Sequence, residues 1–264
     1  MISIVTAYYN RKKLFYETLK SINRSAFKDI EIIAVDDASS PEERIEDLMD
    51  EFPYLKVYRL EKKHKWYYNS CVPFNIGIKK ACGDIIILQN PECLHVHDVL
   101  SYIAKEVNDF NYVTISAYQI GKTITSIIPQ IIEKGLLLNF WGCLPQCSYG
   151  ENTKGAWDDI GWYNHSKYRP VAFHFCSAIT KKNMDNFRGF NMEFSFGIGF
   201  EDNEFIDRIR KSKLQVIIND EVSVIHQWHP ATYDWNGVNK KKYRKNNYLY
   251  EEIKKRNVLN ESVV

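Results

Sequence analysis

The sequence predicts an α/β fold whose sheet is mainly parallel and is flanked by helices. Two features lead to this prediction. β-Branched apolar runs alternate with helix-periodic segments through the first half, and polar side chains follow the ends of the apolar runs. The 264 residues suffice for one large core, and 45% hydrophobic with 26% charged residues is typical of globular proteins. Sheets of this kind bind ligands beyond the carboxyl ends of their strands.

The first two strand–helix pairs have clear local signals. Residues 2–9 (ISIVTAYY) are rich in β-branched side chains and predict a strand, and residues 11–25 space their apolar side chains at helical period. Residues 30–37 predict a second buried strand that ends in two aspartates. A helix is expected over residues 40–52, because serine followed by proline is typical of a helix start.

The alternation continues to about residue 120. Residues 54–60, 84–90 and 112–120 predict strands, a helix closed by glycine is expected over 72–83, and another over 94–107.

The second half has weaker patterns. Residues 120–165 lose their periodicity, and we expect long active-site loops there. No clear boundary separates the halves, so we expect one domain over residues 1–235. The remaining expected elements are strands at 169–180, 214–220 and 222–230 and a helix at 201–213.

Charge and cysteine content narrow the functional classes. The net charge of +2 gives no indication of a nucleic-acid partner, although basic residues gather at 239–247 (NKKKYRKNN). We interpret residues 236–264 as a basic helical extension or tail, whose cations are either solvated or bind phosphates or lipid headgroups. The six cysteines lack zinc-type spacing and no secretory leader is recognisable. These features favour reduced thiols and a cytoplasmic protein, free or at the cytosolic face of a membrane.

Three common enzyme signatures are missing. The turn after the first strand reads TAYYNRKK and has no glycine, which argues against a dinucleotide-binding fold. A P-loop and a G-x-S-x-G nucleophile elbow are also absent. What remains is a set of acids and amides at strand ends, together with an acidic helix start, FGIGFEDNEF (196–205).

These remaining residues resemble the family 2 glycosyltransferases of the GT-A fold, a single Rossmann-like domain. The matching pieces, in order, are VTAYYNR, IEIIAVDDASS, FNIGIKKACGDIIILQNPE and GFNMEFSFGIGFEDNEFIDRI. The last piece, with VIHQWHP, also resembles the C-terminal segment of galactosyltransferases and of bacterial capsule and chondroitin-type polymerases. The resemblance implies a nucleotide-binding half over residues 1–118 and an acceptor-binding half with its loops over residues 119–235.

The resemblance implies a nucleotide site at the first strand ends. Asp36 or Asp37 would accept the N3 proton of uracil, whereas on local grounds this pair is also typical of an Asx-turn. Asn75 matches the family's R-N-x-G helix start, although Phe74 replaces the arginine. The other residues implied to contact the nucleotide are Thr6, Ala7, Tyr8, Asn10, Gln89 and Asn90.

The implied metal site departs from the family pattern at LQNPE. Gln89 stands where the family has the first aspartate of Asp-x-Asp, so Glu92 would be the metal-binding carboxylate, unless the site has lost its metal. His226 or His229 would supply a further ligand. Because imidazole suits Mn²⁺ better than Mg²⁺, we expect manganese.

The acids of FEDNEF carry the expected catalysis. In the resembled family the aspartate of this pair is the general base, which here is Asp202, and Glu201 would hydrogen-bond the acceptor or donor sugar. On local grounds these acids also suit the first turn of a helix, whose dipole would lower their pKa values and keep them ionised. Gly197 and Gly199 would let the backbone pass close to a bound sugar.

Together these features predict a glycosyltransferase that moves a sugar from a UDP-sugar to a hydroxyl of a glycan or glycolipid. The resemblance implies an inverting, metal-dependent reaction. Trp162 and Trp228 are candidate acceptor platforms, with burial in the core as the alternative. The alternative function is a non-catalytic carbohydrate- or nucleotide-binding module. A lipid-linked acceptor would bring the protein to a membrane, an association that the sequence does not demonstrate.

Overall fold

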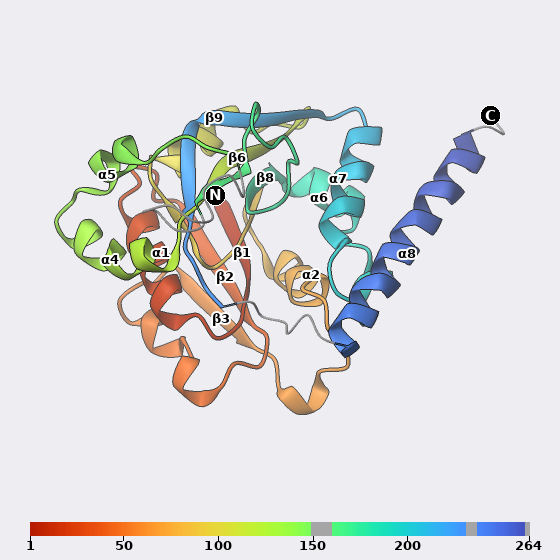
Figure 1. Cartoon of the computed structure of the whole chain (residues 1–264), viewed down its shortest axis with the longest axis horizontal. Helices are drawn as coiled ribbons and strands as arrows, with labels where there is room; N and C mark the ends of the chain where they lie inside the picture. Colours follow the sequence, from red (N-terminus) through yellow and green to blue (C-terminus); the bar gives the residue numbers. More distant parts are fainter. Residues whose placement is uncertain (149–159, 231–236, 262–264) are drawn as a thin grey trace.

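The computed structural model describes residues 1–148, 160–230 and 237–261, with only the backbone given for 257–261. In these residues a nine-stranded sheet forms the centre of the molecule (Figure 1). Its strands are β1 (Ile2–Tyr8), β2 (Ile30–Asp36), β3 (Leu55–Arg59), β4 (Ile85–Gln89), β5 (Cys93–His95), β6 (Asn111–Gln119), β7 (Gly161–Asn164), β8 (Cys176–Thr180) and β9 (Gln215–His226).

The strand directions change near the middle of the sheet, whose order is β3-β2-β1-β4-β8-β6-β9-β5, with β7 paired to β6. The strands β3, β2, β1 and β4 are mutually parallel. Strand β8 is antiparallel to both β4 and β6, whereas β6 and β9 run parallel. The predicted α/β architecture is therefore confirmed, and the carboxyl ends of β1, β2 and β4 meet at one edge.

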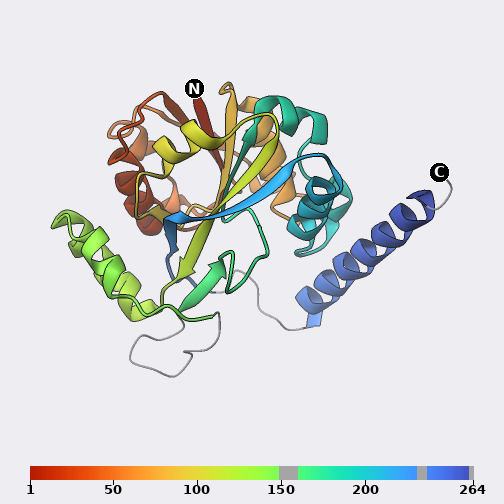
Figure 2. The same cartoon turned by 90° about the horizontal axis from the view of Figure 1, so that it is seen from above.

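Helices cover both faces of the sheet (Figures 1 and 2). The helices are α1 (Lys12–Asn23), α2 (Cys71–Lys80), α3 (Val99–Glu106), α4 (Lys122–Glu133), α5 (Leu137–Cys143), α6 (Lys181–Phe187), α7 (Glu201–Lys211) and α8 (Gly237–Glu261). Four short 3₁₀ helices occur among the described residues: η1 (Pro41–Glu43), η2 (Glu46–Met49), η3 (Lys62–His64) and η4 (Met192–Phe196).

The alternation of side chains along the strands divides the core. Ile2 and Ile4 pack with α1 and α3 on one face, because side chains two residues apart point to the same side. Val5 points to the other face, where α2, α6 and α7 pack. Gly77 allows α2 to approach closely, since a Cβ there would collide with Val5 Cγ1. A third cluster joins α4 and α5 to the ends of β6 and β9.

Two expected helices are corrected by the structure. Residues 40–52 form η1 and η2 and no α-helix, because Arg44 has an extended backbone and Ile45 turns fully into the core. The helix expected over 94–107 begins only at Val99, after Asp98 caps it by accepting from the Ser101 N–H. The residues before it form β5, which pairs with β9.

The second half is more regular than its sequence suggests. The segment expected as loops contains α4 and α5, whose apolar residues pack on the third cluster, while 149–159 lie outside the described residues. The two strands expected near the end are one strand, β9, with an irregularity opposite Ile115 and Ser116. The strand expected at 169–180 begins only at Cys176.

Helix α8 packs against the body at its first half and projects beyond it at its C-terminal end (Figure 2). Asn246 is completely buried and donates from Nδ2 to the carbonyls of Phe194 and Gly199, each at 2.9 Å. Tyr250 donates its hydroxyl to Asp207 Oδ2 at 2.6 Å. The domain boundary expected at 235 falls outside the described residues. Within the described part of the chain, no helix combines the length and apolar character needed to cross a bilayer.

Candidate functional site

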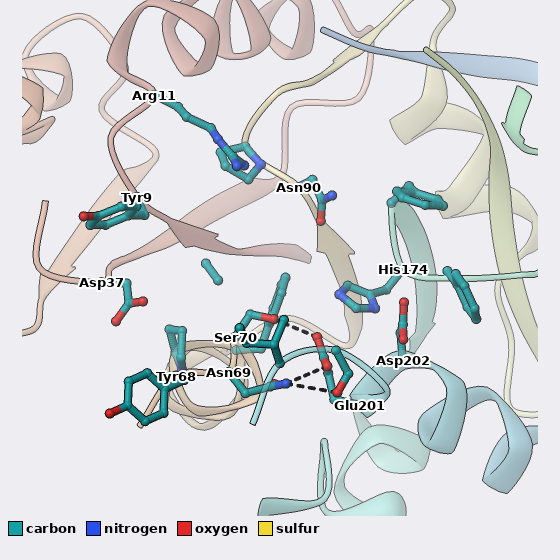
Figure 3. Close-up of a pocket in the computed structure, with 18 of the residues that line it drawn as sticks. Tyr9, Arg11, Asp37, Tyr68, Asn69, Ser70, Asn90, His174, Glu201 and Asp202 are labelled. Carbon is teal, nitrogen blue, oxygen red and sulfur yellow. Dashed lines mark hydrogen bonds between the residues drawn. The ribbon is translucent and has the colours of Figure 1, made fainter. Parts of the chain in front are cut away.

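A cavity of about 450 Å³ opens where the strand ends face the start of α7 (Figure 3). Its lining includes Asp37 after β2 and the pair Glu201 and Asp202 at the start of α7. Asp37 and Asp202 lie on opposite sides of this main cavity (Figure 3). A second cavity of about 350 Å³ shares Tyr9, Asp37 and Lys65 with the main one. The two cavities therefore form adjoining spaces that meet at Asp37.

The structure distinguishes the two aspartates after β2. Asp36 has no exposed surface, pairs with Arg59 at 2.7 Å and accepts from the Ser39 N–H at 2.8 Å. It therefore closes the turn. Asp37 lines both cavities and accepts from Tyr67 Oη and Lys65 Nζ, each at 2.6 Å. Since a carboxylate has about four acceptor sites, Asp37 can still receive a donor from a ligand.

Three more of the predicted nucleotide residues also border the cavities. Ala7 and Asn90 line the main cavity, and Asn10 lines the second. Asn10 also holds the turn after β2, because its Oδ1 accepts from the Ser40 N–H at 2.9 Å.

Four other predicted nucleotide residues support the framework instead. Thr6 and Tyr8 are buried in β1, and Tyr8 donates its hydroxyl to the Glu43 carbonyl. Gln89 is buried and donates to the Cys93 carbonyl at 2.8 Å. Asn75 exchanges hydrogen bonds with the backbone of Phe190, both at 2.8 Å. The contacts of Tyr8, Gln89 and Asn75 fix local structure, and Thr6 is buried within its strand, so the prediction that these four side chains touch a nucleotide does not fit their positions.

Glu92, His226 and His229 converge into one group, called here the metal-ligand cluster. Their ligand atoms all lie within 4.8 Å of one another. His226 Nε2 and His229 Nε2 lie 3.0 and 3.4 Å from the same oxygen, Glu92 Oε1. Arg11 Nη1 contacts the other oxygen, Oε2, at 2.7 Å. Both candidate histidines therefore reach Glu92, with Oε1 facing them and Oε2 held by Arg11.

The electrostatics of this cluster suit a cation. Burial alone would raise the pKa of Glu92, but the Arg11 guanidinium and the two histidines hold it well below its usual range. Burial lowers the pKa of His226, so its imidazole stays neutral, the state in which histidine binds metals. Two imidazoles and one carboxylate form a donor set that binds divalent first-row metal ions. The residues present are thus compatible with a divalent metal.

The acidic pair at the start of α7 is held in place by the start of α2. Phe200 and Gly199 both have left-handed backbones, with φ of 70° and 71°. Glu201 accepts from Asn69 Nδ2 at 2.7 Å and from Ser70 Oγ at 3.0 Å (Figure 3). Glu201 is therefore fixed through both of its oxygens, beside Asp202.

Asp202 has an unusual protonation equilibrium. Burial, with the adjacent Glu201 charge, raises the pKa of Asp202 to about 7, although the Asn203 N–H donates to its Oδ1 and acts in the opposite direction. The expectation that the helix start would lower this pKa is corrected: loss of solvation outweighs the helix amides. A carboxyl group with this pKa can accept a proton near neutral pH.

Gly197 and Gly199, which precede α7, have different roles, although both were expected to let the backbone pass close to a sugar. Gly199 lines the main cavity and needs its left-handed backbone. Gly197 instead allows α8 to approach, because a Cβ there would collide with the Asn246 side chain.

The two tryptophans proposed as acceptor platforms line neither cavity. Trp162 is only 2% exposed and packs edge-on against Tyr118 and Trp141, with ring centroids 4.8 and 5.7 Å away. A ring this deeply buried cannot present a face to a sugar. Trp228 is partly buried, with Lys122 Nζ 5.3 Å from its ring centroid.

Several cavity residues were missed by the sequence reasoning. Arg11 follows the first strand end within the quoted YNR, and Asn69 with Ser70 precedes α2. Polar residues before a helix are typical caps, and this signal could have drawn attention to Asn69 and Ser70. Lys65 and Tyr68 lie in a connection without any motif, so only the fold reveals their place.

Comparison with known proteins identifies relatives and the fold. The uncharacterized glycosyltransferase YwdF of Bacillus subtilis is 33% identical over 112 residues, which are 42% of this chain and 40% of that protein. The crystal structure of S. aureus TarS 1–349 with UDP-GlcNAc covers 88% of this chain and 61% of its own, at 14% identity and a TM-score of 0.56. GalNAc-T7 with UDP, GalNAc and Mn²⁺ covers 90% of this chain and 45% of its own, at 17% identity and a TM-score of 0.59. This chain thus spans less than two thirds of the length of each.

The family assignment rests on a longer sequence match. The pattern described as glycosyl transferase family 2 matches residues 3–170, which includes β1 to β7. The resemblance of the later segment to galactosyltransferases and chondroitin-type polymerases lies entirely beyond this match and stays a prediction. The sheet of mixed direction flanked by helices agrees with the solved neighbours. The chain therefore belongs to glycosyl transferase family 2 and has the GT-A fold.

Proposed function

We propose that this glycosyltransferase moves a sugar from a UDP-sugar to a hydroxyl of a glycan or glycolipid, in a metal-dependent, inverting reaction. The observation that carries the proposal is the main cavity, which places Asp37 opposite the ionisable pair Glu201 and Asp202. Arg11 lines the same cavity and links it to the metal-ligand cluster. The proposed sites for the nucleotide (at Asp37), for the diphosphate (at the metal-ligand cluster) and for sugar transfer (at Asp202) therefore lie next to one another.

The proposed donor end is the second cavity together with Asp37. Asp37 pairs with Lys65 and would accept a hydrogen bond from the N3–H of uracil. The likeness to TarS, solved with UDP-GlcNAc, and to GalNAc-T7, solved with UDP, supports a uridine donor in this proposal.

The proposed metal is a divalent cation held by Glu92, His226 and His229, and we propose Mn²⁺ in preference to Mg²⁺. When bound, such an ion stabilises negative charge on the departing diphosphate. Arg11 keeps Glu92 oriented through Oε2, which leaves Oε1 turned toward both imidazoles. The likeness to GalNAc-T7, whose structure contains Mn²⁺, agrees with this proposal.

The proposed general base is Asp202. Its carboxylate would accept the proton of the acceptor hydroxyl as that oxygen attacks the anomeric carbon, in one displacement that inverts the configuration. Asn69 and Ser70 hold Glu201 in place, and since a carboxylate has about four acceptor sites, Glu201 would still hydrogen-bond the acceptor or donor sugar. Its negative charge also helps to raise the pKa of Asp202.

The pKa of Asp202 predicts the pH dependence of transfer. Only the ionised carboxylate accepts a proton, so kcat/KM should rise as the pH increases and level off above about 7. Below that value the rate should fall roughly tenfold per pH unit. We would measure kcat/KM from pH 5.5 to 8.5 with Mn²⁺ saturating at each pH. A flat profile across this range would contradict Asp202 as the base.

Nucleotide binding tests the proposal without knowledge of the acceptor. UDP at 100 times its dissociation constant should stabilise the fold by about 2.7 kcal/mol, visible as a rise of several degrees in melting temperature. We expect this shift to require Mn²⁺ and to be absent with CDP or NAD. An increase in melting temperature with UDP that is the same with and without Mn²⁺ would contradict the metal dependence in the proposal. Absence of a melting shift with any nucleotide would favour the binding-module alternative. Gln89, which replaces the first aspartate of the Asp-x-Asp motif, is the reason to test that alternative.

A further inference from the structure

A surface beside the main cavity combines exposed rings with lysines. We call it the aromatic rim: Trp66, Tyr68 and Phe196, together with Lys242 and Lys245 of α8. The three aromatic residues are 54%, 45% and 50% exposed, although large rings usually dominate cores. Tyr68 also lines the main cavity, so the rim continues directly from it (Figure 3).

The rim residues contact one another. The rings of Trp66 and Phe196 lie 5.3 Å apart. Lys242 Nζ lies 3.2 Å from the centroid of the Tyr68 ring, and Lys245 Nζ lies 5.1 Å from that of Phe196. Neither lysine pairs with a carboxylate among the residues that the structure describes. The rim therefore offers exposed ring surface and two cations whose charge is not neutralised by a described acid.

Hydrogen bonds fix the position of the aromatic rim relative to the proposed base, Asp202. The buried Asn246 ties α8 to the backbone on both sides of Gly197. The Tyr68 N–H donates to the Ser195 carbonyl at 2.8 Å, which joins the two loops that carry the rings. The next residues after Tyr68 are Asn69 and Ser70, the anchors of Glu201. An occupant of the rim would thus lie next to the reacting end of the cavity.

The charge of α8 indicates what kind of occupant fits. Residues 237–250 contain five lysines and arginines and no aspartate or glutamate. Cations in the first half of a helix oppose its dipole, so helix stability does not explain them. Apolar residues do not gather on one face of α8, unlike those of helices that insert into a membrane surface. These features favour an anionic carbohydrate over a lipid surface.

We propose that the aromatic rim is an acceptor subsite for a glycan that carries carboxylate or phosphate groups. A sugar ring would stack on Trp66 and Phe196, and its anionic groups would pair with Lys242 and Lys245. The proposal rests on the glycosyltransferase function and names the acceptor class for the same site.

Binding of two matched hexasaccharides tests the subsite directly. Hexagalacturonate carries a carboxylate on each sugar, whereas maltohexaose is neutral. We would titrate each into the wild-type protein and follow the heat of binding, with Trp66→Ala as a ring variant. The wild type should bind hexagalacturonate at least about tenfold more tightly than maltohexaose, and Trp66→Ala should weaken that binding.

Charge reversal on α8 provides the matched control. Lys242→Glu with Lys245→Glu should weaken hexagalacturonate binding about tenfold or more, whereas Lys254→Glu with Lys255→Glu, farther along the same helix, should leave it within about twofold. Equal loss in both double variants would reveal nonspecific attraction and overturn the subsite. Absence of hexagalacturonate binding, or binding only to phosphatidylglycerol vesicles, would overturn it too. The UDP-induced melting shift should persist in every variant, so its absence would point to failure of the proposed function and not of the rim.

Discussion

Replacing Asp202 by asparagine should lower the transfer rate by roughly 10²–10⁴-fold, the usual contribution of a general base. Asparagine keeps the shape of the side chain but cannot accept the proton of an acceptor hydroxyl. Asp37 lies across the cavity, so the affinity for UDP should change by less than about twofold. The measurement is kcat for sugar transfer together with the dissociation constant of UDP, both compared with wild type. Equal losses in both quantities would make Asp202 a structural residue.

Asp185→Asn is a suitable control, since Asp185 is an exposed acid whose described charged partner is Lys181 on the same helix. It removes one negative charge away from the cavity and should retain transfer. Any loss shared by both variants would then reflect overall charge.

Asp202→Asn should also alter how the stability of the folded protein depends on pH. Asp202 has a pKa of about 7 in the folded protein against an ordinary value of 3.8. A group whose pKa rises on folding contributes stability that is complete below the unfolded pKa and is lost as pH rises through the folded pKa. Between pH 4 and 8 the wild type should therefore lose stability that Asp202→Asn does not lose. The melting temperature of Asp202→Asn relative to that of the wild type should therefore increase as the pH rises across this range.

The sheet was largely predictable because buried parallel strands leave a strong signal. Runs such as residues 30–37 are apolar on both faces, and their alternation with helices allows few arrangements. The pattern failed where tertiary contacts decide the structure. Residues 40–52 have a good helix start, yet burial of Ile45 breaks them into two short turns. The first residues of 94–107 pair with β9, a partner more than 120 residues away, which local periodicity cannot reveal.

Some residues of the candidate site were predictable from motifs, but its geometry was not. The motifs identified Asp37 and Asp202, which line one cavity, and Glu92, whose partner Arg11 lines the same cavity. They could not separate Asp36 from Asp37, because both follow the same strand and only burial distinguishes them. They also gave the wrong direction for the pKa of Asp202, since the desolvation that raises it depends on the packing of distant segments.

Replacing Glu92 by glutamine should abolish metal-dependent UDP binding and lower kcat/KM by about 10³-fold, since a bound metal contributes several kcal/mol to charge stabilisation. The amide has the same size but no charge. It would also leave the Arg11 guanidinium beside a buried neutral group, and breaking such a pair costs about 3–5 kcal/mol of folding stability. Loss of activity in Glu92→Gln alone therefore does not distinguish metal loss from unfolding.

His229→Ala separates these causes. His229 is 19% exposed in its side chain, and its removal leaves the Arg11–Glu92 pair intact, so the fold should survive. It nevertheless removes one of the three proposed ligands, and Mn²⁺ affinity measured by titration calorimetry should fall at least about tenfold, as it does when metal sites lose supporting groups. His64→Ala, at an exposed histidine in η3, should leave Mn²⁺ affinity unchanged. If His229→Ala and His64→Ala bind Mn²⁺ as tightly as wild type, the cluster is not the metal site, and Arg11 with Glu92 is simply a buried ion pair that supports the strand ends.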